Sequence, residues 1–185
     1  INKKGLSVIK DSFTMAFPFE YSRALVTYAE NKWTLIDKNG NSILGDTYEY
    51  IVEIKPGYYQ ITQNKSDDND DFLLGIVDST GHYIASMGSF KRIAKIGTEY
   101  IILTLDEGDK YRQKVIDYSG KAILTKEWDT NQWISGEFNN GLAPIHLYKD
   151  KSGNFNSANS YYGYTNLQGE IVINDSAFQF VNPFS

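Results

Sequence analysis

The fold is decided by the stretch Ile36-Asp37-Lys38-Asn39-Gly40-Asn41-Ser42-Ile43-Leu44, because its pattern recurs along the chain. Further nine-residue segments align with it on the glycine, at 1–9, 77–85, 116–124 and 165–173. Every copy has Asp or Asn three residues before the Gly and Val or Ile three residues after it. Such recurrence is the signature of a repeat protein. The chain is therefore expected to be an array of one short unit.

Each copy predicts a β-hairpin. Asp or Asn at the head of a turn accepts hydrogen bonds from backbone two residues on. Gly takes the positive φ that ends a type I turn with a bulge. The β-branched residue that follows restarts an extended strand. The segments around Gly40, Gly81 and Gly120 thus have the pattern of strand, turn and strand.

A second pattern lies upstream of each hairpin. Three apolar residues recur at a spacing of three, at Phe13, Ala16 and Phe19; at Tyr48, Ile51 and Ile54; at Phe90, Ile93 and Ile96; and at Phe178, Val181 and Phe184. A copy between Trp128 and Phe138 fits with an insertion. This spacing suits neither a regular strand nor a helix, so we interpret it as a short irregular or bulged segment. Alternating apolar residues after each triplet indicate a half-buried strand.

These elements define the units and the fold class. Complete units are expected at 13–44, 48–85, 90–124 and 128–173, with partial units at 1–9 and 178–185, in a single repeat domain over 1–185. The partial ends either close a ring or belong to a longer array, and we favour the longer array. No segment has sustained helical spacing, so we expect an all-β, antiparallel array of hairpins. Three to four strands per unit of about 40 residues match a propeller blade, and an open β-solenoid is the alternative.

Composition excludes several classes of function. The formal net charge is −5, and no basic stripe is present, so nucleic-acid binding is not expected. No apolar run reaches the roughly 18 residues that would span a bilayer. Cysteine is absent, which excludes disulfides and thiolate metal sites. We expect no cofactor and no membrane insertion by this segment.

The repeat resembles the WG-repeat family of bacterial proteins, also called the KWG-repeat family. The first half of that unit, approximately Phe-x-x-Gly-Leu-Ala-x-Val, is matched best by 138–145, and the second half, Trp-Gly-Tyr-Ile-Asp-x-x-Gly, by 33–37, 74–78 and 162–166. No unit keeps both the Trp and the Gly that name the family, and Gln113-Lys114 keeps neither. The resemblance implies binding or assembly, often in envelope-associated or secreted proteins, and no defined reaction.

Few residues offer a case for catalysis or metal binding. The two histidines, His82 and His146, have no Cys and no nearby His in sequence, so we interpret them as a surface and a strand residue. The acidic run 67–71 could hold Ca²⁺ but lacks the Gly and distal Glu of a calcium loop, and we favour a solvated loop. Asp37, Asp78 and Asp117 recur in phase because the turn requires them.

Aromatic residues outside the repeat phase are the candidates for partner contacts. They are Tyr118, Trp128, Trp133, Tyr161 and Tyr162. Exposed Tyr and Trp rings suit sugar faces or a protein partner, although packing between units is the alternative for most of them.

Two functions are weighed. The favoured one is a non-catalytic module that binds or scaffolds a protein or a glycan, in an exported or surface protein of a bacterium, with the cytoplasm as the alternative location. The other is a propeller-type hydrolase of carbohydrates, which would require two carboxylates converging in a pocket, about 5–10 Å apart.

Overall fold

The computed structural model describes residues 9, 12–65, 72–106, 112–128, 132–148 and 160–174. These residues form four antiparallel sheets and contain no helix, which confirms the all-β, antiparallel prediction. The partial unit at 178–185 and nearly all of that at 1–9 lie outside the described residues, as do 66–71 and most of 149–161. The chain divides into two compact halves, residues 1–89 and 90–185, called unit 1 and unit 2 from this point on. Each of them contains two of the complete repeats expected from the sequence.

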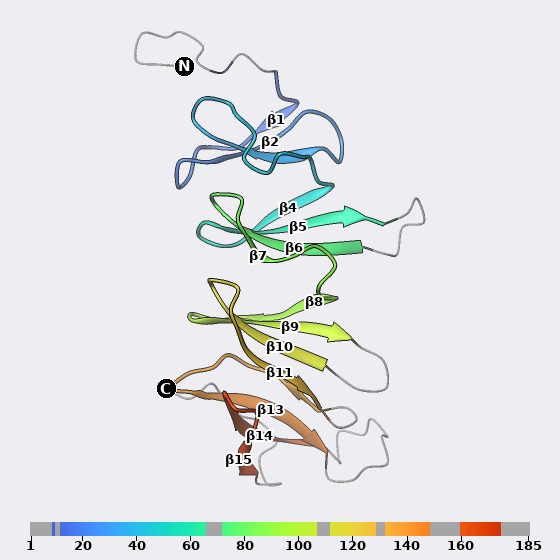
Figure 1. Ribbon diagram of the computed structural model, residues 1–185, viewed down its shortest axis with the longest axis vertical. Helices are drawn as coiled ribbons and strands as arrows, with labels where there is room; N and C mark the ends of the chain where they lie inside the picture. The colour runs from blue at the N-terminus through green and yellow to red at the C-terminus, as the bar shows by residue number, and fades with distance from the viewer. Residues whose placement is uncertain are drawn as a thin grey trace. The chain divides into compact units, whose positions relative to one another are not determined.

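Unit 1 holds two sheets whose strands lie in sequence order (Figure 1). The first comprises β1 (Met15–Ala16), β2 (Ala24–Thr27) and β3 (Trp33–Ile36). The second comprises β4 (Tyr50–Lys55), β5 (Tyr58–Asn64), β6 (Phe72–Asp78) and β7 (Tyr83–Ala85). Each sheet is a meander of consecutive antiparallel strands, as expected from hairpins joined end to end.

Unit 2 repeats this plan with two four-stranded sheets. One comprises β8 (Arg92–Ile96), β9 (Tyr100–Asp106), β10 (Arg112–Asp117) and β11 (Ala122–Glu127). The other comprises β12 (Trp133–Ile134), β13 (Leu142–Tyr148), β14 (Ser160–Asn166) and β15 (Ile171–Asn174). Figure 1 shows β8 to β11 side by side in chain order, in the same way as β4 to β7.

The aspartate-glycine turns have the predicted geometry. In the turn from 37 to 40, the N–H of Gly40 donates to the carbonyl of Asp37 at 3.0 Å, and Gly40 has a φ of +90°. Oδ1 of Asp37 accepts from the N–H groups of Asn39 at 2.8 Å and Asn41 at 2.9 Å. The turns headed by Asp78, Asp117 and Asn166 repeat these bonds. A register shift follows in three of the hairpins, β6–β7, β10–β11 and β14–β15, which is the predicted bulge.

The triplet segments become the first strands of the sheets. In β4 the pairing with β5 shifts register between Glu53 and Lys55, and in β8 the pairing with β9 shifts between Ile93 and Lys95. The spacing of three therefore reflects a bulged strand, because the extra residue at the bulge breaks the two-residue alternation.

Apolar faces of neighbouring sheets form the core of each unit. In unit 1, Leu35 on β3 packs with Ile51, Tyr59, Ile61 and Val77 of the second sheet. In unit 2 the corresponding core joins strands of both sheets through Ile102, Val115, Trp128, Ile134, Phe138, Ala143, Ile145 and Leu147. The alternation of buried and exposed residues along each strand provides these faces.

A polar link also joins the two sheets of each unit. In unit 1, Trp33 and Tyr48 exchange backbone hydrogen bonds, both at 2.8 Å. In unit 2, the buried side chain of Gln113 replaces such a bridge, because its Oε1 accepts from the N–H of Ile134 at 2.7 Å and its Nε2 donates to the carbonyl of Ile134 at 3.2 Å. Aligned on their turns, Trp33 and Gln113 occupy the same repeat position.

Candidate functional site

Three of the predicted contact residues have well-defined internal partners. The hydroxyl of Tyr118 donates to the carbonyl of Gly97 at 2.7 Å, and that of Tyr161 donates to Oδ1 of Asn174 at 2.8 Å. Trp128 is only 2% exposed and packs in the core of unit 2. Trp128 is therefore a core residue, as the alternative of internal packing predicted. A partner contact at the other positions stays a prediction.

The remaining two candidates lie on one row across the last sheet. Trp133 on β12 is paired in register with His146 on β13, and His146 is paired with Tyr162 on β14. The rings of Trp133 and His146 are stacked with centroids 4.2 Å apart, and those of His146 and Tyr162 meet edge to face at 5.1 Å. The structure therefore brings Trp133 and Tyr162 together around a buried histidine, a proximity that no sequence pattern indicated.

The acidic residues of the turns are occupied by local bonds. Hydrogen bonds from Asn41 and Asn39 hold the pKa of Asp37 below its ordinary value, and the hydroxyl and N–H of Ser119 do the same for the pKa of Asp117. At Asp78 burial opposes the shift, but bonds from Thr80 and His82 outweigh it and lower the pKa. These carboxylates stabilise turns, as the phase of the repeat predicted.

No metal site is evident in the described part of the chain, where no group of three or more His, Cys, Asp or Glu side chains could hold an ion. The acidic run 67–71, considered above for Ca²⁺, lies outside the described residues.

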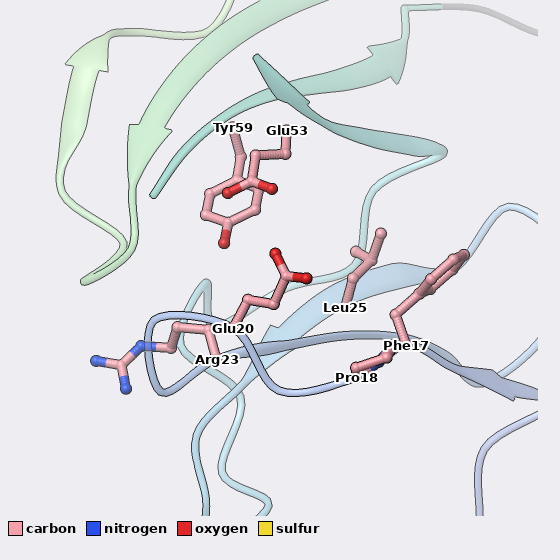
Figure 2. Close-up of a pocket in the computed structure, with 7 residues that line it drawn as sticks. All are labelled: Phe17, Pro18, Glu20, Arg23, Leu25, Glu53 and Tyr59. Atoms are coloured by element: carbon pink, nitrogen blue, oxygen red, sulfur yellow. The ribbon is translucent and has the colours of Figure 1, made fainter. Parts of the chain in front are cut away.

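A pocket of about 250 Å³ lies in unit 1, between the turn that follows β1 and the edge of the second sheet. Its lining residues are Phe17, Pro18, Glu20, Arg23, Leu25, Glu53 and Tyr59. Figure 2 shows the carboxylate of Glu20 and the hydroxyl of Tyr59 pointing toward each other, with Glu53 beside the tyrosine ring. The guanidinium of Arg23 points away from them. The pocket thus presents oxygen atoms inside an apolar wall.

Glu20 is positioned by a tight turn. Its backbone N–H and carbonyl both pair with Arg23, at 2.7 Å each, and the two residues between them, Tyr21 and Ser22, have φ values of +47° and +65°. These are the dihedrals of a type I′ turn, which favours Asn-Gly. The turn at the same repeat position in the last sheet, 139–142, has Asn140-Gly141 in this conformation. Tyr and Ser adopt it less readily, and backbone held in such regions is concentrated at functional sites.

The other two charged groups of the pocket are fixed by backbone. Oε1 of Glu53 accepts from the N–H of Gly57 at 2.9 Å, which leaves Oε2 available to the pocket. Nε of Arg23 donates to the carbonyl of Ser79, and its Nη1 donates to the carbonyl of Ser22. These bonds hold the arginine charge on the far side of the turn, as seen in Figure 2.

Tyr59 supplies the hydroxyl of the pocket. Tyr59 is 6% exposed as a residue, but its hydroxyl is not one of the fully buried unpaired atoms of the described residues, because it opens onto the pocket (Figure 2). Burial, together with the negative charges of Glu53 and Glu20, raises the pKa of Tyr59 to about 12. The hydroxyl therefore stays neutral at physiological pH and can both donate and accept a hydrogen bond.

Sequence reasoning did not single out Glu20, Glu53 or Tyr59. Tyr59 and Glu53 occupy ordinary positions of the repeat, so no pattern distinguishes them. One signal was present: where 138–142 reads Phe-Asn-Asn-Gly-Leu, 19–23 reads Phe-Glu-Tyr-Ser-Arg. Tyr-Ser is less favourable than Asn-Gly where φ must be positive. Its presence at 21–22 therefore indicates that the stability of the turn is not what determines the residues at these positions.

The described residues include no helix that is long and apolar enough to cross a membrane. A comparison with protein-family models found no match to this chain. A comparison with curated proteins found no match either.

Proposed function

We propose that this chain is a non-catalytic repeat module that binds a protein or a glycan partner, and that the pocket of unit 1 is part of its binding surface. The observation that carries the proposal is the combination of the Tyr59 hydroxyl and two carboxylates lining one pocket, with exposed aromatic rings beside it. Phe17 is 49% exposed and Tyr21 is 60% exposed. Aromatic side chains around a few oriented polar groups are typical of ligand sites.

The row of exposed apolar residues beside the pocket supports the same proposal. Met15, Phe17, Phe19 and Tyr21 alternate along the segment from β1 to the type I′ turn and are all exposed. Phe17 is held in place by a tilted contact with Trp33, with ring centroids 6.0 Å apart. Contiguous exposed apolar residues with ordered positions favour a partner contact.

The test is a selection for ligands followed by a targeted variant. The immobilised protein is screened against a glycan array and a phage-displayed peptide library, and the ligands are measured again on the double variant Phe17→Ala, Tyr21→Ala. We expect binding to fall at least tenfold, because aromatic anchors at an interface each contribute about 2 kcal/mol or more. Val172→Ala, an exposed apolar position in unit 2, is the control. Ligands that bind the double variant and the native protein equally would contradict the proposal.

The arrangement of the sheets is part of the same proposal. We propose that the sheets are successive blades of a propeller-like array related to WG-repeat proteins, with an open β-solenoid as the alternative. The support is the four-stranded meander of about 40 residues, which matches a propeller blade. Small-angle X-ray scattering distinguishes the two, since a closed ring has a smaller radius of gyration than an extended solenoid of the same length.

Location in an exported or surface-attached bacterial protein remains part of the proposal and rests on the family resemblance. Fractionation of the cells that produce the full-length protein is the test. Recovery in the cytoplasmic fraction alone would contradict it.

A second function is supported by one observation, the convergence of Glu20 and Glu53 on the same pocket. Two carboxylates on either side of a glycosidic bond are the machinery of glycoside hydrolysis. A panel of nitrophenyl glycosides tests this alternative, with Glu20→Gln and Glu53→Gln as variants. Turnover that either variant abolishes would establish hydrolysis and displace the binding proposal, and the absence of turnover across the panel would remove the alternative.

A further inference from the structure

The two units differ at one repeat position that lies at the pocket. Pro18 precedes the last residue of the first triplet, and Lys95 precedes the last residue of the third. Glu53 immediately precedes the last residue of the second triplet, and Glu137 immediately precedes Phe138, the last residue of the fourth. The pair Pro18 and Glu53 in unit 1 is therefore equivalent to the pair Lys95 and Glu137 in unit 2.

In unit 2 this position forms an ion pair. Nζ of Lys95 lies 3.8 Å from Oε1 of Glu137, and the side chains are 43% and 29% exposed. The adjoining turn contains Gly97 at the position of Glu20, and a Cβ built on Gly97 would contact Cγ of Glu137 at 3.4 Å. The glutamate of unit 2 thus already has an ammonium group beside it.

In unit 1 both elements of that arrangement are changed. Pro18 carries no charge, and the space that a lysine side chain could fill belongs to the pocket that Pro18 lines. Glu20 adds a second carboxylate where unit 2 has Gly97. Neither Glu20 nor Glu53 has a cationic partner in the described part of the chain, since Arg23 donates to the carbonyls of Ser79 and Ser22.

The third oxygen of the pocket does not depend on the carboxylates. Tyr59 is more than nine-tenths buried as a residue, and its hydroxyl is directed into the pocket (Figure 2). A hydroxyl held at the wall of a pocket by a buried ring can donate a hydrogen bond to a ligand or accept one from it.

We infer that the pocket of unit 1 binds a primary ammonium group, carried by a lysine side chain of a protein partner. An ammonium has three N–H donors and no acceptor, and Glu20, Glu53 and Tyr59 offer three groups whose oxygens can accept. The apolar walls at Phe17 and Leu25 suit the methylene stem, because lysine buries its stem while its charge stays among polar groups. This inference rests on the proposed binding function and narrows it to a protein ligand.

The experiment is an NMR titration of the ¹⁵N-labelled protein with Nα-acetyl-lysine N-methylamide. The uncharged analogue Nα-acetyl-norleucine N-methylamide has the same stem and is the control ligand, and the arginine analogue is the third. We expect the lysine analogue to shift amide resonances of 17–25 and 53–59 and to leave those of unit 2 unmoved. Equal shifts with norleucine, equal affinity for arginine, or shifts confined to other residues would overturn the inference.

Matched variants assign the effect to named groups. Glu53→Gln and Glu20→Gln keep the shape of each side chain and remove its charge. Each should weaken binding of the lysine analogue by about three- to fivefold, because both carboxylates are exposed and solvent screens their attraction for the ammonium. Tyr59→Phe should weaken it by about threefold. Glu30→Gln, an exposed position in the turn at the other end of β2, should have no effect, and an equal loss at Glu30 would indicate nonspecific attraction.

A final variant tests the comparison between the units directly. Pro18→Lys restores the pattern of unit 2 and should fill the pocket with an ammonium group from the chain itself, which abolishes binding of the lysine analogue. Unchanged binding to this variant would overturn the assignment of the pocket. The proposed function is tested separately by the ligands selected on the native protein. If the lysine analogue does not bind while those ligands still require Phe17 and Tyr21, the inference is wrong and the proposed binding function is supported.

Discussion

Units 1 and 2 solve the same structural problem with different atoms. In unit 1 the link between the sheets is a backbone bridge between Trp33 and Tyr48, and in unit 2 it is the side-chain amide of Gln113 bonded to the backbone of Ile134. The carboxamide has one donor and one acceptor group in the spacing of a peptide, so it can replace a strand partner. Gln113 in place of the Trp that stands at this repeat position in unit 1 is therefore a change of linkage rather than a loss of one.

A second difference lies in how the turns pack. A Cβ added to Gly81 in unit 1 would lie 2.8 Å from the carbonyl oxygen of Ile43. A Cβ added to Gly169 in unit 2 would meet side chains, Cδ1 of Leu124 at 3.2 Å and Cδ of Lys126 at 3.4 Å. In both cases a turn packs against the segment that follows the equivalent turn of the preceding repeat. Unit 1 places rigid backbone at this contact, while unit 2 places side chains that can move.

The largest expected effect comes from these glycines. Gly81→Ala should lower the free energy of unfolding of unit 1 by about 3 kcal/mol, because a left-handed Ala and a clash with fixed backbone add together. Gly169→Ala should lower that of unit 2 by about 1–2 kcal/mol. Hydrogen-exchange mass spectrometry reads the two units separately. Equal losses at the two positions would contradict the proposed difference in packing.

The next effect tests the amide link of unit 2. Gln113→Leu keeps the volume roughly constant but leaves the N–H and carbonyl of Ile134 without their partners. We expect a loss of about 2 kcal/mol in urea denaturation, the scale for unpaired buried backbone groups. Gln168→Leu, in an exposed turn of the same unit, should change stability by less than about 0.5 kcal/mol. A neutral result at Gln113 would show that apolar packing alone joins these sheets.

Acid should affect unit 1 more than unit 2. The described turns of unit 1 are headed by Asp37 and Asp78, and those of unit 2 by Asp117 and Asn166. Each Asp has a pKa below the ordinary 3.8, so its contribution is complete above that pH and is lost as pH falls through the lower folded value. We expect Asp37→Asn with Asp78→Asn to reduce the pH dependence of unit 1 between pH 5 and about pH 2, measured by denaturation at each pH. An unchanged profile would assign acid sensitivity to other groups.

The smallest effect concerns the ion pair of unit 2. Lys95→Ala should change stability by less than about 0.5 kcal/mol, because the pair with Glu137 is partly exposed and screened by solvent. Thermal denaturation at low and high salt checks this. A loss well above that value would mean that the pair is a structural requirement of the repeat, and the absence of Lys at position 18 would then need compensation elsewhere in unit 1.

Much of the local structure could be predicted from sequence, and the pocket could not. Turn chemistry acts within five residues, so the aspartate-glycine pattern at 78–82 predicts the turn, its bulge and the role of the carboxylate together. Glu20 and Glu53 lie in different repeats and meet only when two sheets pack, so no local signal relates them. Gln113 stands where another repeat has Trp33, and its partner Ile134 lies 21 residues away on another sheet.

The sequence by itself determined the repeat, the antiparallel hairpins and the structural use of Asp37, Asp78 and Asp117, because these follow from backbone dihedrals and hydrogen bonds between near neighbours. Only the tertiary structure decided which residues that differ from the repeat pattern form contacts with other parts of the chain. Packing gave Gln113 a backbone to bond and placed Trp128 in the core. It also left Glu20, Glu53 and Tyr59 around one pocket, since burial and electrostatic environment depend on which sheets meet.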